Sequence, residues 1–476
     1  MKKNKNYLYL GIILVFYFIS RLVNLNSLPV FGDEAIYVRW AQIIKSVDTL
    51  RFIPLTDGKQ PLFMWLNAAT LKFIVDPLIA GRIISVFAGA GILTLLFLIT
   101  NSLIAPLLYL FVPFSFFFDR LATADNLLSF FGLFSFFLSL KLAQKPAWDK
   151  AMVLGAVLGL AWLTKSPAIY FIVLSLFTYV AFKKDNYKKI YYPLISALIA
   201  IIIYNILRLG PSFSQIALRN KDYVWPILEI LKHPLDPLVP HLHDTFTIFH
   251  YYLTLPILLI PSLYFFFKKH IKFDFLFLVS CFWFLLPLLA NAAMAKVFTG
   301  RYILYTLPYL LIIISYFLKP LFQRRYFWLI ALFLILPLTR TLHISLFPYT
   351  VKLPQTDSGY NTGWTSGWGI RSSADYLRNR AKYANIIVGT EGYFGTLPDG
   401  LQIYGNQVSQ LTIFGVGLNI TKIPEKLIDA RNYGDEVYLL FNQSRLKLDS
   451  SELSKLILVR KTPKPDGDAL LLYKLL

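Results

Sequence analysis

The chain has 476 residues, of which 56% are hydrophobic and 15% are charged, whereas soluble domains carry about 25% charged residues. This composition excludes an ordinary soluble globular protein. The formal net charge of +21 lies mainly in residues 1–345, which hold 32 Lys and Arg against 14 Asp and Glu. Basic loops between apolar segments explain this excess better than nucleic-acid binding does.

Eleven apolar segments predict transmembrane helices. The first follows a basic N-terminus and has no small-residue cleavage site after it, so we expect a retained span rather than a signal peptide. Only helices are expected, because unpaired backbone groups cannot face lipid. The predicted spans are 7–26, 80–99, 103–118, 125–141, 151–164, 168–182, 190–208, 246–267, 273–291, 302–318 and 326–345.

The distribution of Lys and Arg predicts the orientation of these spans. One set of loops holds 16 Lys and Arg in 38 residues, and the opposite set holds 12 in 110 residues. The first set is therefore expected in the cytoplasm together with the N-terminus. This orientation makes the protein an integral plasma (inner) membrane protein whose residues after about 346 lie outside.

Two predicted outer loops, 27–79 and 209–245, are longer than simple connectors. Apolar spacing in 35–46 and 62–74 predicts two helices within the first loop. Beyond residue 345, strand-length apolar runs at 385–389, 401–404, 411–415, 436–441 and 469–475 alternate with helical stretches at 372–383 and 424–432. The expected fold is thus mainly α and polytopic over 1–345, with a small extracytoplasmic α/β domain over 346–476.

Acidic residues that could carry chemistry cluster at the predicted outer ends of the spans. Asp33 and Glu34 follow the first span; either they are solvated, or one of them is a general base toward an acceptor hydroxyl or amine, and we favour Asp33. Asp119, Arg120 and Asp125 lie near the turn after the third span. They form either a surface ion pair or a second acidic wall for a sugar hydroxyl or a divalent cation.

Basic residues occupy the same predicted face. Lys59 precedes the proline that starts a helix, and Lys165 lies in a very short outer turn. Each is either a solvated or snorkelling side chain, or a ligand of a departing phosphate. Arg301 and Tyr302 open the tenth span, where a guanidinium fits a phosphate well. Arg21 and Arg82 are weaker candidates of the same kind.

The evidence for a metal or nucleotide site is weak. His241, His243 and Asp244 could bind zinc, but they lack a convincing further ligand. Whether a metal is bound stays open, with a divalent cation as one possibility. No glycine-rich nucleotide loop is present, which argues against a soluble nucleotide-sugar donor. The single cysteine, Cys281, excludes an intrachain disulfide.

Six short motifs in order resemble those of the GT-C class of polyprenyl-phosphate-sugar glycosyltransferases, in the branch of bacterial aminoarabinose transferases and protein O-mannosyltransferases. The resemblance covers roughly residues 8–320. Two positions depart from the family pattern: Gln60 stands where proline is frequent, and Ser166 where glycine is frequent. The motifs are Asp33-Glu34 with Ala35 and Tyr37, Gly58–Leu62, Gly81-Arg82, Asp125-Asn126, Leu163–Pro167 and Gly300–Tyr302.

The resemblance implies an inverting transfer of a monosaccharide from a lipid-phosphate donor to a cell-envelope acceptor, which is a glycolipid, a polysaccharide or a protein. It implies that Asp33 is the base or positions the acceptor, with Glu34 and Asp125 as further catalytic candidates. Lys59, Lys165 and Arg301, assisted by Arg82 and Tyr302, would bind the donor phosphate. The alternative is a transporter or flippase of lipid-linked sugars, which also needs many helices.

Overall fold

The computed structural model describes residues 2–323 and 327–476. These residues form two compact units. Unit 1 comprises residues 1–25, 47–66 and 82–344, and unit 2 comprises residues 26–46, 67–81 and 345–476. Each unit is described by itself below.

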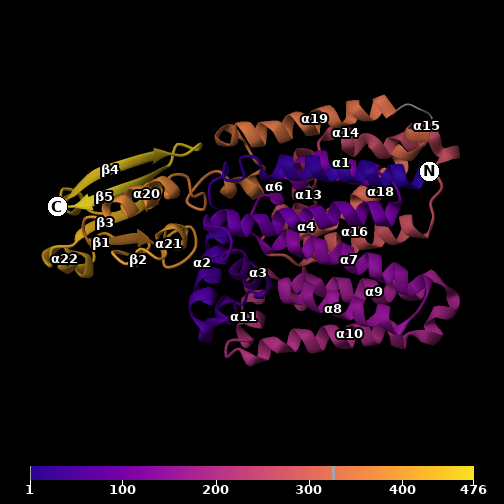
Figure 1. The fold of residues 1–476 in the computed structure, drawn as a ribbon, viewed down its shortest axis with the longest axis horizontal. Coiled ribbons are helices and arrows are strands. Elements are labelled where there is room, and N and C mark those ends of the chain that lie inside the picture. Colours follow the sequence, from indigo (N-terminus) through magenta and orange to yellow (C-terminus); the bar gives the residue numbers. More distant parts are fainter. Residues whose placement is uncertain (1, 324–326) are drawn as a thin grey trace. The chain divides into compact units, whose positions relative to one another are not determined.

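Unit 1 is a helical bundle. In Figure 1 its long helices α4, α7, α8 and α10 run nearly parallel, and α8 packs against both α7 and α10. Close packing of α8 on α10 depends on Gly155 and Gly159, where a Cβ atom would lie 2.7 Å from Ile199 and Ile203. The helices are α1 (Lys2–Leu22), α3 (Leu62–Thr70), α4 (Pro77–Thr100), α5 (Ile104–Phe111), α6 (Pro113–Phe118), α7 (Ala124–Gln144), α8 (Trp148–Thr164), α9 (Ile169–Phe182), α10 (Tyr191–Tyr204), α11 (Ser214–Tyr223), α12 (Ile227–Lys232), α13 (Leu238–Tyr252), α14 (Leu255–Leu259), α15 (Tyr264–Phe267), α16 (Phe275–Met294), α17 (Gly300–Ile303), α18 (Leu307–Gln323) and α19 (Phe327–Leu346).

Each of the eleven predicted spans contains helix in the structure. Among the described residues, five helices are long and apolar enough to cross a membrane, or six if one bent pair counts as a single span. The chain is therefore an integral membrane protein, while eleven crossings stay a prediction. Several segments are too short by themselves because prolines break them, as Pro113 does between α5 and α6.

The predicted span 246–267 is not one straight helix. α13 and the segment Leu255–Phe267 meet at 113°. Thr254, at the break, has a backbone φ of 72°, and Pro256 follows it. The apolar pattern continues through this break, so hydropathy alone could not reveal it.

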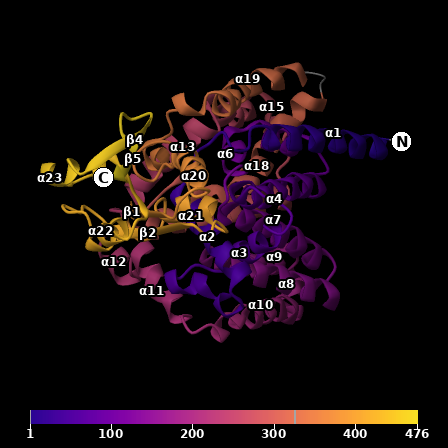
Figure 2. The same cartoon turned by 60° about the vertical axis from the view of Figure 1, so that its left-hand side comes forward.

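Unit 2 is built on a mixed five-stranded sheet in the order β2-β1-β3-β5-β4. β1 pairs in parallel with β2 and β3, whereas β5 is antiparallel to β3 and β4. Figure 2 shows α20, α21 and α22 beside the sheet. The strands and helices are β1 (Ile386–Glu391), β2 (Leu411–Gly417), β3 (Glu436–Asn442), β4 (Leu456–Pro463), β5 (Ala469–Leu475), α2 (Gly32–Ser46), α20 (Ile370–Arg380), α21 (Asp399–Gly405), α22 (Glu425–Asn432) and α23 (Ser450–Leu453).

The predicted α/β architecture of the C-terminal region is confirmed, with two local errors. Residues 401–404 belong to helix α21 rather than to a strand, and strand β4 was missed. The apolar residues at 401, 403 and 404 fit either period, and the neighbouring helix decides the outcome. β4 is an edge strand with mostly polar or exposed side chains, so it lacks a strong apolar pattern.

Unit 2 also includes α2, which follows the first predicted span. Ala35, Val38 and Ala41 have no exposed surface, and α2 packs against α21. Arg39 donates hydrogen bonds to the side chains of Gln402 and Asn406, 3.1 Å each. The compact unit therefore draws on residues before 345, beyond the predicted domain 346–476.

A buried polar network ties the sheet of unit 2 to the glycine-rich loop before α20. The ammonium of Lys464, only 3% exposed, donates to the carbonyls of Gly363 and Ser366 and to the Asn442 side chain, 2.8, 2.7 and 2.5 Å. Asn442 in turn donates to Glu391 through its backbone and its amide. Burial lowers the pKa of Lys464 to about 8 and raises the pKa of Glu391.

Candidate functional site

The centre of the candidate site in unit 1 is the ion pair between Lys165 and Asp125. The Lys165 ammonium lies 2.5 Å from a carboxylate oxygen of Asp125. The Asp125 side chain is 3% exposed and that of Lys165 is 23% exposed. The pair therefore keeps its cation accessible while its anion is buried.

The ring of Tyr302 contacts both Lys165 and a second cation, Arg301. The Lys165 ammonium lies 4.7 Å from the ring centroid, and the Arg301 guanidinium carbon lies 5.0 Å from it. Both distances are those of cation–π contacts. Arg301 also donates to the Tyr302 hydroxyl at 3.3 Å. Four predicted site residues, Asp125, Lys165, Arg301 and Tyr302, thus come together from three segments of the chain.

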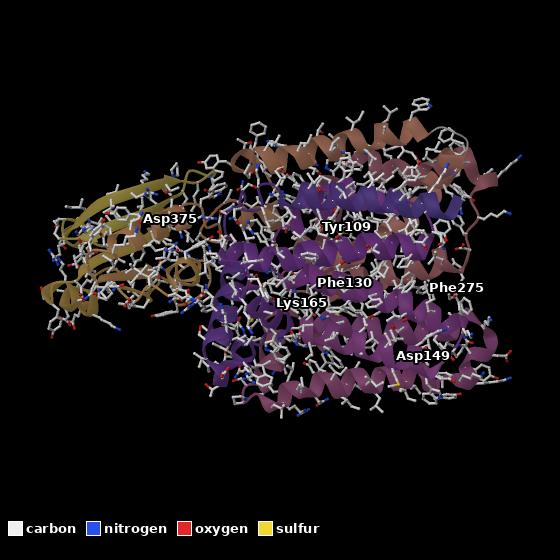
Figure 3. All side chains as sticks on the ribbon, in the orientation of Figure 1. Tyr109, Phe130, Asp149, Lys165, Phe275 and Asp375 are labelled. Carbon is white, nitrogen blue, oxygen red and sulfur yellow. The ribbon has the colours of Figure 1, made fainter. Side chains whose placement is uncertain are left out.

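Breaks between helices expose these side chains. Lys165 ends α8 in an extended conformation before the Ser166–Ala168 turn (Figure 3). Arg301 lies in α17, a helix of one turn that follows the extended residue Thr299. Asp125 lies in the first turn of α7, where the helix dipole favours a negative charge. Two cations and one carboxylate thus lie close together, and cations of this kind can bind an anion.

Lys59 lies in a neighbouring group of charges. Its ammonium is 2.5 Å from Asp57, whose other oxygen is 2.8 Å from Arg219. The adjacent residue, Gln60, donates a 2.7 Å hydrogen bond to the Ser166 hydroxyl. This bond joins the Lys59 segment to the turn that carries Lys165. Asp57 could be predicted as a partner of Lys59 because it lies two residues away in the sequence. No local pattern indicated that Arg219 would join them.

Arg82 has no exposed surface and donates a 2.7 Å hydrogen bond to the carbonyl of Leu25. Its position in the structure is therefore a buried one near the start of α4, and its predicted contact with the donor phosphate stays a prediction.

Asp119 is a buried structural centre rather than a surface group. It accepts hydrogen bonds from Tyr17, Tyr109 and Asn126 at 2.9, 2.8 and 2.9 Å, and pairs with Arg21 at 3.3 Å (Figure 3 labels Tyr109). Gly89 allows this approach, because a Cβ there would lie 2.0 Å from the Tyr17 hydroxyl. Neither a surface ion pair nor an exposed acidic wall describes it.

Arg120 turns away from Asp119. Its guanidinium donates to the carbonyls of Ser20, Val23 and Asn24, at the end of α1. Arg120 thus stabilises the C-terminal end of a helix, where carbonyls lack intrahelical partners.

Asp33 and Glu34 lie in the first turn of α2, in unit 2. Glu34 has no exposed surface, and its carboxylate accepts a 3.0 Å hydrogen bond from the Phe31 backbone. This contact resembles one half of a capping box. Asp33 is half-buried. The structure therefore gives Glu34 a structural contact and leaves Asp33 the more accessible of the two acids.

The histidine cluster does not assemble a metal site. Within residues 2–323 and 327–476, no group of three or more His, Cys, Asp or Glu side chains could hold a metal ion. His241 instead stacks on Phe298 at 4.6 Å and contacts the carbonyl of Ala292. Binding of a divalent cation beside Asp125 stays a prediction.

Part of the chain matches a known protein family. Residues 58–207 match the family model described as dolichyl-phosphate-mannose-protein mannosyltransferase. That segment contains Lys59, Arg82, Asp125 and Lys165. No curated protein sequence matches the chain.

Two solved structures of one protein share the fold over nearly the whole chain. ArnT from Cupriavidus metallidurans bound to undecaprenyl phosphate is 13% identical, with a TM-score of 0.62 over 99% of this chain and 98% of that chain. Its apo state is also 13% identical, with a TM-score of 0.60 over 98% of each chain. The Saccharomyces cerevisiae Pmt1-Pmt2 protein O-mannosyltransferase bound to its sugar donor is 18% identical over 45% of this chain and 34% of that chain, with a TM-score of 0.35.

The fold of ArnT and the family match over residues 58–207 together confirm the resemblance to the GT-C class of polyprenyl-phosphate-sugar glycosyltransferases, in the branch of aminoarabinose transferases and protein O-mannosyltransferases.

Proposed function

We propose that the protein is a membrane glycosyltransferase that moves a monosaccharide from a polyprenyl-phosphate donor to a cell-envelope acceptor on the outer face of the plasma membrane. The observation that carries this proposal is the convergence of Lys165 and Arg301 on the ring of Tyr302. Two cations held at breaks between helices suit a phosphate at the end of a lipid. The family match and the ArnT fold support a donor of this class.

The proposed reaction is a single displacement that inverts the anomeric carbon. The acceptor oxygen or nitrogen forms a bond to that carbon while the bond from carbon to the phosphate oxygen breaks. Asp33 takes the acceptor proton, and the phosphate leaves on its lipid with the bonding electron pair. Lys165 and Arg301 stabilise the negative charge that grows on this phosphate, which is the effect of preorganised charge at a developing anion.

Lys59 and Arg82 have supporting roles in this proposal. Lys59 contributes a third cation through the segment that Gln60 joins to Ser166. Arg82, which is buried, would act by holding the turn after α1 through the carbonyl of Leu25. Glu34 would hold the first turn of α2 while Asp33 faces the acceptor. A divalent cation, if required, would bind near Asp125, and chelation during the assay tests that requirement.

The decisive experiment measures transfer of a labelled sugar from a polyprenyl-phosphate donor by the purified full chain in detergent, with envelope extract as acceptor. Lys165→Met and Arg301→Gln should each lower the rate about 10²–10³-fold, as loss of one charge-stabilising donor does. Lys188→Gln is the matched control, since this lysine is exposed and contacts nearby Asp185 and Tyr187. Equal rates in all three variants would contradict the proposed site.

A flippase of lipid-linked sugars is the second candidate. Two observations favour it more than the sequence did: the 113° bend after α13, and the fully buried pair of Arg21 and Asp119. Broken helices and buried charges are frequent in transporters. A flippase would move the lipid-linked donor across the membrane of a lipid vesicle without releasing its sugar. Transport without release of lipid phosphate would replace the transferase proposal.

A further inference from the structure

Unit 2 carries a groove that none of the predicted site residues lines. Two adjoining pockets of about 520 and 400 Å³ share Asp375 and Arg378 on α20. The larger extends to α2 and the loop 71–77, and the smaller extends to Lys382 and Gln410. Figure 3 labels Asp375, which lines both pockets. We refer to these two pockets together as the groove.

The groove is basic although unit 2 is nearly neutral. Unit 2 has 18 Lys and Arg against 15 Asp and Glu, while the groove has five cations against two acids. The charge excess of the whole unit is therefore concentrated here. The five cations are Lys45, Lys72, Arg371, Arg378 and Lys382.

One of the two acids is already occupied by structural contacts. Asp76 pairs with Arg371 at 2.8 Å, accepts from Asn26, and caps the first turn of α4 through two backbone bonds of 3.0 Å. Asp375 lies 3.9 Å from Arg378, and both side chains are at least half exposed. The remaining cations therefore present an accessible positive surface to a ligand.

The groove also offers apolar and amide contacts suited to sugar rings. The Phe73 side chain lines the larger pocket and is 86% exposed. An exposed ring face can pack against the apolar C–H face of a pyranose, while the amides of Asn406 and Gln407 can both donate to and accept from hydroxyls. An aromatic surface with a few polar groups is the usual composition of a small-ligand site.

We propose that this groove binds an anionic oligosaccharide, one that carries carboxylate or phosphate groups along its chain. Resting on the proposed function, the ligand is the acceptor glycan. Volumes of about 520 and 400 Å³ fit several sugar residues better than a single ion. Binding itself requires neither the donor nor the catalytic residues.

The test is fluorescence anisotropy of a labelled hexasaccharide of uronic acids with the full chain in detergent at low salt. Arg378→Gln should weaken binding about two- to fivefold, the effect of one exposed charge pair. Asp375→Asn, one helical turn away, should strengthen binding. Arg431→Gln on α22 is the matched control, since this exposed arginine lies outside both pockets.

Other probes separate the possible ligands. Phe73→Ala should weaken binding of the hexasaccharide and leave binding of a hexaglutamate peptide unchanged. Equal binding of the peptide and the hexasaccharide, equal binding of a neutral hexasaccharide, or no opposite shifts for Arg378→Gln and Asp375→Asn would each overturn the proposal. Binding without any sugar transfer would refute the transferase function alone, and transfer without binding would refute the groove alone.

Discussion

Removing Lys165 should destabilise the protein more than removing its partner does. In Lys165→Met, the Asp125 carboxylate is left with 3% exposure and no ammonium at 2.5 Å. Loss of one partner of a fully buried pair costs about 3–5 kcal/mol. Because Lys165 is 23% exposed, water reaches the pair in part, and we expect a smaller cost of about 2–3 kcal/mol.

The opposite change should cost less. In Asp125→Asn the amide oxygen still accepts from Lys165, and the ammonium can reach water, so we expect about 1 kcal/mol, the typical net value of one hydrogen bond. The double variant removes both charges and should recover most of the stability that Lys165→Met loses. The two variants that lack Lys165 should lose transfer, by about 10²–10³-fold, because they lose a cation that faces the phosphate.

The measurement is unfolding of the purified protein in mixed detergent, followed by tryptophan fluorescence, beside the transfer assay. If Lys165→Met unfolds within about 0.5 kcal/mol of the wild type, as surface substitutions do, the carboxylate is not buried as described. If the double variant is the least stable of the three, the interaction free energy between Lys165 and Asp125 has the opposite sign to the one expected. Either result would refute the reasoning from burial.

Three further predictions test other parts of the molecule. Asp33→Asn should lower turnover about 10²–10⁴-fold while donor binding persists, and retention of more than about a tenth of the activity would exclude a general base here. The pKa of Lys464 is lowered to about 8 in the folded protein, so between pH 8 and 10.5 the unfolded chain binds one more proton than the folded chain. The free energy of unfolding should therefore rise with pH by about 3 kcal/mol over this window. Lys464→Met should abolish that rise, as unfolding curves at pH 7 and 10 would reveal. In a variant with Cys281 replaced by serine, a cysteine at Lys145 should resist an impermeant thiol reagent in intact cells while one at Tyr433, 89% exposed, should react, and the reverse pattern would invert the topology.

The sequence predicted the helices and the charged ends of the helices well, because both depend on local patterns. Lys165 could be singled out since a cation in a short outer turn is unusual. Its contact with Tyr302 could only be anticipated from the order of the family motifs. Side chains whose partners are distant in sequence were harder to interpret.

Asp119 illustrates that limit. Its partners Arg21 and Tyr17 lie about a hundred residues earlier, so adjacency in sequence suggested the wrong partner, Arg120. Glu34 illustrates a different limit of prediction from the sequence. In the sequence Glu34 is indistinguishable from its neighbour Asp33. Because α2 starts at Gly32, the Glu34 carboxylate can accept a hydrogen bond from the Phe31 backbone.

The hydrogen bond between Gln60 and Ser166 has a consequence for how this sequence can change. These are the two positions where the chain departs from the family pattern, and the structure places their side chains 2.7 Å apart. Replacing Gln60 with proline alone, or Ser166 with glycine alone, would remove this hydrogen bond. A lineage that exchanges both must pass through a less stable intermediate, so we expect the two positions to covary among relatives.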